Sequence, residues 1–301
     1  MRRSHLALLL AALLPGCAGA SAPTDIAARL PGGRTLNLFC AGRGAPTVIL
    51  ESGWSGDSRG WPRVMPALAA RSRVCAYDRA GSGRSSAGPL PRDGAAIARD
   101  LDLGLRAAGV AGPFVAVGHS TGALYVRLFA DRRPRDVIGM VLVDGDVEHQ
   151  QRRFEAAFGP GAESFAPLIA RSAMCLAAAR AGPIPADDKR LSVCAVDPPG
   201  AAGERWSARL SELESLSGAT SAELDGGRAS YGAMPLIALT AGQTFPGPAA
   251  QFWSGLHREI AIRSTRGEER IVADSGHLMM VDRPDAIVGA VRDVIAAARQ
   301  R

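Results

Sequence analysis

Lysine is almost absent from this chain of 301 residues. Lys189 is the single lysine, although lysine and arginine together number 35 and leave a net charge of +6. The arginines are scattered, and aromatic residues, which make up 5% of the chain, do not alternate with them. Surfaces that bind nucleic acid gather basic residues on one face. We therefore expect solvated surface charge and no nucleic-acid partner.

The sequence also lacks a long apolar run: no segment is long and apolar enough to cross a bilayer. The apolar stretch of residues 6–14 is too short for this, and it follows two arginines, Arg2 and Arg3. A basic start followed by a short apolar region is typical of a signal peptide, which we place at residues 1–20. We expect the protein to be exported, to the periplasm or beyond the cell.

Two modes of signal cleavage stay open. Residues 14–17 resemble a bacterial lipobox, in which Cys17 would become the lipidated N-terminus, although Pro15 is unusual in that position. Residues 18–20, Ala-Gly-Ala, instead fit the rule for ordinary cleavage. A lipid on Cys17 is the one membrane link that the sequence offers.

The sequence has few cysteines and no pattern that binds a metal. It contains no C-x-x-C motif and no cluster of cysteine and histidine, so we expect no metal site. Besides Cys17, the chain contains an even number of cysteines, namely Cys40, Cys75, Cys175 and Cys194. In an oxidising compartment this favours disulfides, and buried free thiols are the alternative.

Short β-branched runs alternate with segments of helical period, which predicts a doubly wound, mostly parallel α/β sheet. Hydrophobic residues make up 47% of the chain, enough for one large core. Residues 145–230 break the alternation, because they are rich in Ala, Ser and Leu and contain no strand-like run. We interpret them as a helical cap inserted after the sixth strand, between the core segments 24–144 and 231–301.

The most informative segment is 114–122, in which a short apolar strand runs into the motif G-x-S-x-G. Residues 123–130 continue with helical spacing. A sharp turn between strand and helix exposes the serine hydroxyl, and glycines on both sides avoid a clash with neighbouring backbone. This context predicts that Ser120 is a nucleophile rather than a helix N-cap.

A serine nucleophile needs a base, and the sequence offers five histidines. Three lie in the signal, at the start of the cap and in a predicted helix, and these are His5, His149 and His257. His119 precedes Ser120, and we expect its side chain to point away from the nucleophile's face. His277 is left, in a loop between the last strand and the last helix, where open α/β sheets gather catalytic residues. We therefore assign His277 as the base.

Together these segments resemble the α/β-hydrolase superfamily, in its cap-bearing, esterase-like branch. The resemblance extends from residue 26 to residue 298 and is carried by segments 48–53, 75–81, 117–122, 141–144 and 275–277. It is specific for the α/β-hydrolase fold and much less so for the substrate. One departure is Ser52-Gly53, where many members have His-Gly. The oxyanion donor there is a backbone group, so the departure need not abolish activity.

The resemblance implies an acid that orients the histidine. Many members carry it in the loop after the strand that ends at Thr240, but residues 241–247 contain no carboxylate. In haloalkane dehalogenase relatives the acid can stand at the end of the preceding strand, which here is Asp144. Asp144 is the predicted acid and Asp146 the reserve, while helix capping is the alternative role for either. Those relatives use an aspartate nucleophile, so Ser120 disfavours dehalogenation.

The resemblance also implies two backbone donors for the oxyanion. One is the N–H of Thr121, directly after the nucleophile. The other is the N–H of Trp54, in the loop that follows the strand ending at Glu51. The Trp54 side chain could equally line the pocket.

Two disulfide pairings follow. In the sheet order usual for the resembled fold, the strands that hold Cys40 and Cys75 are neighbours, which implies a bond between them. Cys175 and Cys194 both lie in the cap and flank the Gly/Pro segment 181–185, which suits a turn. We predict a second disulfide there.

We therefore expect an exported serine hydrolase that cleaves a small-molecule ester, or an amide or lactone, through an acyl-enzyme and without a cofactor. An aminopeptidase or a C–C hydrolase on the same triad is the alternative, and its cap would need a charged clamp. Cap acids such as Glu163 and Asp187 are candidates for it. An inactive hydrolase fold that serves as a binding module is the alternative from another class. Substrate identity and oligomeric state stay open.

Overall fold

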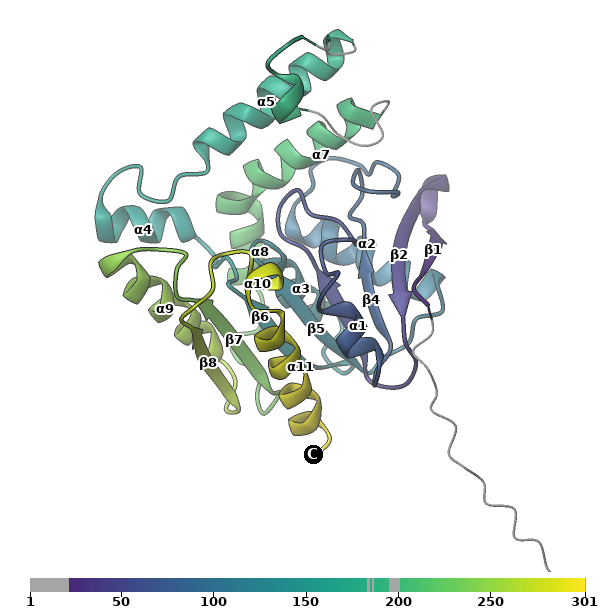
Figure 1. Cartoon of the computed structure of the whole chain (residues 1–301), viewed down its shortest axis with the longest axis vertical. Coiled ribbons are helices and arrows are strands. Elements are labelled where there is room, and N and C mark those ends of the chain that lie inside the picture. The colour runs from purple at the N-terminus through teal and green to yellow at the C-terminus, as the bar shows by residue number, and fades with distance from the viewer. Residues whose placement is uncertain (1–21, 183–184, 186, 195–200, 301) are drawn as a thin grey trace, which may run out of the picture.

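The computed structural model describes residues 22–182, 185, 187–194 and 201–300. Eight strands form one sheet in the order β1-β2-β4-β3-β5-β6-β7-β8 (Figure 1). The pairings of β2 with β1 and with β4 are antiparallel, and all the others are parallel. The strands are β1 (Thr24–Arg29), β2 (Thr35–Ala41), β3 (Thr47–Glu51), β4 (Val74–Tyr77), β5 (Phe114–His119), β6 (Val137–Val143), β7 (Leu236–Ala241) and β8 (Gly267–Val272). The predicted doubly wound, mostly parallel sheet is confirmed.

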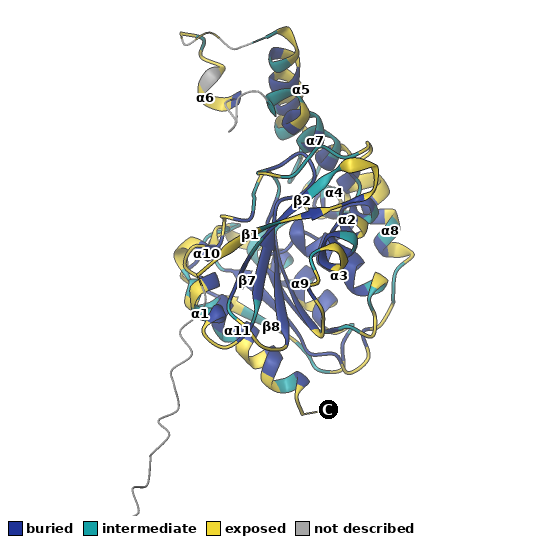
Figure 2. Ribbon diagram, turned by 90° about the vertical axis from the view of Figure 1, so that its right-hand side faces the viewer, coloured by how far each residue is buried: buried dark blue, intermediate teal, exposed yellow. Residues whose placement is uncertain are grey.

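Helices cover both faces of this sheet (Figure 2). Within the core, α1 (Met65–Ala69) and α11 (Pro284–Ala298) pack on one face, and α2 (Gly94–Ala107), α3 (Gly122–Arg132) and α9 (Gly247–Ala261) pack on the other. Neighbouring strand residues alternate between the two apolar layers, because successive side chains in a strand point to opposite faces. In β5, Phe114 and Ala116 join the layer of α2 and α3, whereas Val115 and Val117 join the layer of α1 and α11. This burial on both sides explains the continuous apolar runs.

A helical insertion follows the sixth strand, as predicted. It leaves the carboxyl end of β6 and returns at β7, and helices α5 and α7 pack against each other above the sheet (Figure 1). Its helical elements are α4 (Gln150–Phe158), α5 (Ala166–Ala181), α6 (Leu191–Cys194), α7 (Ala202–Ser215), the π-helical segment η3 (Leu216–Thr220) and α8 (Ser221–Asp225). The remaining short helices are η1 (Pro31–Gly33) and α10 (Met279–Asp282). The insertion therefore stands at the strand ends where residues 120, 144 and 277 lie.

The predicted signal of residues 1–20, with Cys17, lies outside the described residues. Within the part of the chain that the structure describes, no helix has both the length and the apolarity needed to cross a membrane.

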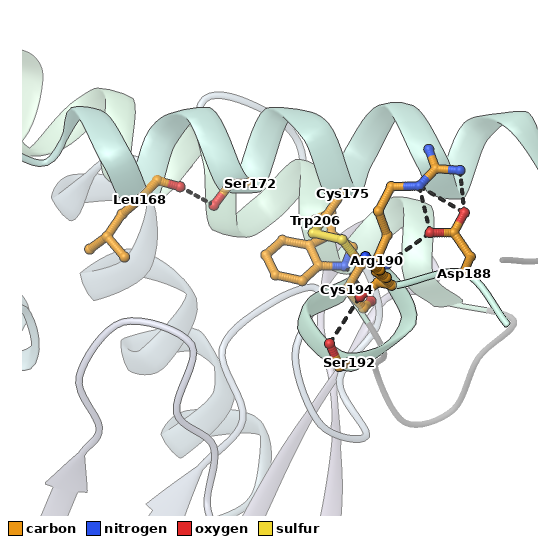
Figure 3. Close-up of a disulfide and its surroundings, with 9 residues drawn as sticks. Leu168, Ser172, Cys175, Asp188, Arg190, Ser192, Cys194 and Trp206 are labelled. Carbon is orange, nitrogen blue, oxygen red and sulfur yellow. Dashed lines mark hydrogen bonds and ion pairs between the residues drawn. A yellow bond between two sulfur atoms is a disulfide. The ribbon is translucent and has the colours of Figure 1, made fainter. Parts of the chain in front are cut away.

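Both predicted disulfide pairs are present in the structure. Cys40 and Cys75 are direct partners in the antiparallel pairing of β2 with β4, and their Cα atoms are 4.1 Å apart. Cys175 of α5 is bonded to Cys194 of α6, with Cα atoms 5.1 Å apart (Figure 3). The indole of Trp206 packs on this second disulfide and donates a hydrogen bond of 2.9 Å to the Cys194 carbonyl. The disulfide thus joins α5 to α6, and Trp206 brings α7 into the same small core.

We predict that the combined change Cys175→Ser and Cys194→Ser destabilises the insertion by roughly 3 kcal/mol, because the bond restricts the unfolded loop that it closes. Limited proteolysis should then cut the insertion before the sheet, and chemical denaturation measures the loss. Non-reducing peptide mapping of protein made in an oxidising compartment should recover both pairs. Free thiols at all these positions, or a crosslink between Cys40 and Cys194, would contradict the prediction.

Candidate active site

Ser120 lies on a strained turn between β5 and α3. Its φ angle is 53°, a region that L-residues with side chains seldom adopt. The flanking glycines leave no room for a side chain. A Cβ on Gly118 would lie 2.4 Å from the Gly122 carbonyl oxygen, and one on Gly122 would lie 2.7 Å from that of Glu51. Strand, turn and helix therefore form the arrangement that the motif predicts, with Ser120 at its tip.

His277 and Asp144 meet beside this turn, although 133 positions separate them in the sequence. His277 lies in the loop between β8 and α10, and its Nδ1 is 2.7 Å from Oδ2 of Asp144, directly after β6. Asp144 is fully buried and also accepts hydrogen bonds from the Thr244 hydroxyl at 2.6 Å, the Trp253 indole at 2.8 Å and the Ala241 amide at 3.0 Å. The carboxylate is thus held in place from several sides.

These contacts determine the charge of the pair. Burial alone would raise the pKa of Asp144, but the hydrogen bonds from His277, Thr244 and Trp253 outweigh it and lower the pKa. Burial would lower the pKa of His277, but the bond to Asp144 and its negative charge outweigh this and raise the pKa. Asp144 therefore stays ionised, and it stabilises the protonated form of the imidazole.

We predict that kcat/KM rises with pH through a midpoint above 6.5, the usual pKa of histidine. A general base must be neutral, and a raised pKa keeps His277 protonated up to a higher pH, so activity is lost as the pH falls through that value. The pH dependence of kcat/KM for an uncharged ester measures the midpoint. A midpoint well below 6.5 would contradict this assignment of the base.

The expectation that His119 points away from the nucleophile's face is wrong. The His119 ring lines the same cavity as Ser120, and its centre is 4.7 Å from that of the His277 ring. Burial and the neighbouring His277 lower the pKa of His119 to about 4, so the ring is neutral. Its Nε2–H donates a hydrogen bond of 2.8 Å to the backbone carbonyl of His277. His119 therefore holds the loop that carries the candidate base.

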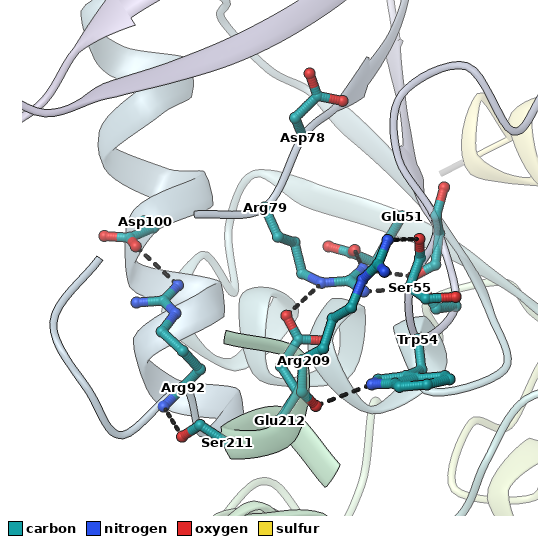
Figure 4. A network of polar contacts seen from close by, with 12 residues as sticks. Glu51, Trp54, Ser55, Asp78, Arg79, Arg92, Asp100, Arg209, Ser211 and Glu212 are labelled. Carbon is teal, nitrogen blue, oxygen red and sulfur yellow. Dashed lines mark hydrogen bonds and ion pairs between the residues drawn. The ribbon is translucent and has the colours of Figure 1, made fainter. Parts of the chain in front are cut away.

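The Trp54 backbone amide belongs to a peptide bond that a buried arginine holds in place (Figure 4). Arg79 donates to the carbonyl oxygens of Ser52 at 2.7 Å and of Gly53 at 2.8 Å. The Gly53 carbonyl and the Trp54 N–H share one trans peptide, so they point in opposite directions. Fixing that carbonyl therefore fixes the direction of the N–H. The Trp54 indole in addition donates to the Arg209 carbonyl of α7 at 2.9 Å.

Arg79 also links the core to the insertion. Its guanidinium bonds Glu51 of β3 at 2.7 Å and Glu212 of α7 at 3.0 Å, and all three side chains are buried. Burial raises the pKa of Glu51 to about 7, although Arg79 and a hydrogen bond from Tyr77 act against it. Arg79 has no role that its sequence pattern predicts. In the sequence, Arg79 can be noticed only as a charged residue two positions after a buried strand. Its partners become apparent only in the fold.

A cavity of about 670 Å³ opens over the serine. It is lined by Ser120, His277, Trp54 and Thr121, so the predicted nucleophile, base and oxyanion residues meet at one place. Apolar and aromatic side chains form most of its wall, among them Phe165, Leu168, Leu213, Phe245, Trp253, Met280 and Val281. This composition is typical of a site for a small organic ligand.

Two acids of the insertion also reach the cavity. Asp146, the reserve acid, lines it but makes no hydrogen bond to His277 among the described residues. Glu163 lines it from the segment between α4 and α5, whereas Asp187 is not part of the wall. The other two histidines within the described ranges lie outside the wall, and these are His149, bonded to Asp225, and His257, packed on Trp253. In those ranges no group of three or more His, Cys, Asp or Glu side chains could hold a metal.

Comparison with known proteins agrees with this architecture. Residues 38–290 match the Alpha/beta hydrolase family. The uncharacterized protein YqjL of Bacillus subtilis (strain 168) is 28% identical over 264 residues, which cover 86% of this chain and 87% of that protein.

Solved structures of similar fold include the epoxide hydrolase CorEH, with a TM-score of 0.63 and 20% identity over 91% of this chain and 99% of that one. An esterase from Thermogutta terrifontis has a TM-score of 0.62 and 19% identity over 92% of this chain and 99% of that one. At these identities the likeness concerns the fold. The family match over most of the sequence, with the sheet order and the serine turn, leads to one conclusion: the chain belongs to the alpha/beta hydrolase family.

Proposed function

We propose that this protein is an exported serine hydrolase that cleaves a carboxylic ester of a small molecule. The observation that carries the proposal is the bond between His277 and Asp144 beside Ser120 in one apolar cavity. Ser120 attacks the ester carbonyl, and His277 takes its proton and then gives it to the leaving alcohol. Asp144 keeps the His277 tautomer that presents Nε2 to the serine. Water then releases the acyl group by the same route.

The developing oxyanion needs donors that are already in place. We propose the N–H groups of Trp54 and Thr121. Neither amide donates a backbone hydrogen bond elsewhere in the described ranges, and Arg79 orients the first of them. A serine nucleophile with a charge-paired histidine needs no metal or organic cofactor for this chemistry.

Export is part of the proposal. Two buried disulfides support an oxidising compartment, since such bonds are rare in the cytoplasm. The N-terminal signal pattern supports it independently, with lipidation of Cys17 as one of its two outcomes.

A fluorophosphonate probe tests the mechanism without knowledge of the substrate. The probe labels only an activated serine. We therefore expect labelling at Ser120 in the native protein and none in the denatured protein. A panel of esters varied in acyl length then identifies the acyl group that the cavity prefers. Native protein that reacts with neither the probe nor any ester would instead support the binding-module alternative.

An amine-recognising hydrolase, such as an aminopeptidase, is the second candidate. Glu163 lies at the cavity rather than on the outer surface of the insertion, where it could act as part of a clamp. Aminoacyl amides assayed beside the matching esters test this candidate.

A further inference from the structure

The cavity over Ser120 contains two carboxyl groups from the insertion. Asp146 and Glu163 both line it, and no arginine or lysine is among the described residues of its wall. The chain as a whole has an excess of basic over acidic residues, 35 against 29. The acidic side chains of the cavity thus contrast with the basic excess of the chain as a whole.

Asp146 is buried yet unpaired. Asp146 is 6% exposed, and none of the described residues makes a hydrogen bond to its carboxylate. Burial raises the pKa of Asp146 to about 7; the charge of His277 acts against this, and the negative charges of Glu163 and Asp144 add to it. Glu148, two positions on, differs, because Arg127 and Arg263 bond it and hold its pKa at about 2. Unlike Glu148, Asp146 has no arginine bonded to it among the described residues.

Glu163 has only one weak contact. The Gln150 amide donates to it at 3.4 Å, near the limit of a hydrogen bond. Burial raises its pKa as well, although Gln150 and His277 act in the other direction. Both acids line the same cavity as Ser120 and His277, so they can contact part of the same substrate, and both raise the pKa of His277.

The surrounding wall suits a cation. The aromatic rings of Trp54, Phe165, Phe245 and Trp253 line the same cavity. The faces of such rings attract ammonium groups, most strongly where water is excluded. Asp146 is also next to the nucleophile, because its backbone N–H donates to the Ser120 carbonyl at 3.0 Å.

We propose that Asp146 and Glu163 bind an ammonium group of the substrate, close to the ester that Ser120 attacks. The preferred substrates are therefore cationic esters, with a positive nitrogen in the acyl or the alcohol part. This inference rests on the proposed ester hydrolysis and adds a substrate class to it. A bound ammonium would pair with both carboxylates, neither of which is bonded to an arginine or lysine among the described residues.

Pairs of isosteric esters test the proposed ammonium site. Alanine ethyl ester and ethyl isobutyrate differ by an ammonium in place of a methyl group on the acyl side. Acetylcholine and 3,3-dimethylbutyl acetate differ by nitrogen in place of carbon on the alcohol side. The preference is the ratio of kcat/KM for the charged ester to that for the neutral one, followed by acid release. Within one variant this ratio cancels changes in the base, because both esters use the same His277.

We expect Asp146→Asn and Glu163→Gln each to lower the preference about tenfold or more in at least one pair, relative to the unchanged protein. Glu155→Gln is the matched control. It removes the same charge from α4, outside the cavity wall, and should leave the ratio as it is. Since Asp146 is buried, Glu163→Gln gives a second test if the first variant does not fold.

Two failures can be told apart. If neutral esters are hydrolysed and neither variant changes the preference in either pair, the ammonium site is wrong and ester hydrolysis stands. If native protein hydrolyses no ester and no fluorophosphonate labels Ser120, the proposed function itself is wrong, and the ammonium inference falls with it.

Discussion

Ser120→Ala is expected to lower kcat for ester hydrolysis by about 10⁴ to 10⁶ while the protein stays folded. The hydroxyl is the group that forms the acyl-enzyme, and no other side chain of the turn can replace it. Alanine keeps the Cβ that the backbone already accommodates at a φ of 53°, so the strained turn should persist. Steady-state assays of the purified variant on the best ester of the panel measure the loss.

Ser55→Ala is a suitable control for this change. Ser55 also has a positive φ, of 63°, and lines the same cavity, so the substitution is chemically identical and structurally similar. We expect a much smaller effect there. If Ser120→Ala retained a tenth of the original turnover, the serine mechanism would be wrong.

The second large effect is expected from Asp144→Asn, at roughly 10⁴-fold in kcat. An asparagine at this position loses the negative charge that stabilises the protonated His277. It also brings an amide NH₂ to a place where Thr244, Trp253 and His277 all donate. Histidine in the wrong tautomer cannot accept the serine proton.

Asp146→Asn is the comparison for that result. With an uncharged ester it should cost far less than Asp144→Asn, because Asp146 makes no bond to His277 among the described residues. Both variants should first be checked for an intact thermal unfolding transition. A severe loss of activity in the Asp146→Asn variant alone would mean that Asp146, and not Asp144, is the acid that orients His277.

Much of the fold and part of the site could be predicted because they depend on local pattern. Buried parallel strands need continuous apolar runs, and these identify β3, β5 and β6 without any knowledge of their neighbours. The serine turn needs small residues within a few positions, so Gly118, Ser120 and Gly122 identify it by themselves. The place of His277 follows from the order of strand and helix around it.

The tertiary structure decided what depends on distant residues. Asp144 and Asp146 stand at the same strand end, and nothing local distinguishes them. Only contacts to residues 97 to 133 positions away bring Asp144 rather than Asp146 against His277. The direction of the His119 side chain depends in the same way on a distant contact, because the loop that it bonds lies 158 positions further on.

The sequence by itself determined the family and the serine turn. It could not determine the charge of the cavity or the partners of Arg79, because both depend on where side chains of the insertion meet the core. Glu163 and Glu212 come from segments whose sequence predicts only helices and the connections between them. The direction of Glu212 follows from the packing of α7 on α5 and from its contact with Arg79 of the core, and such non-local contacts are not encoded in periodicity.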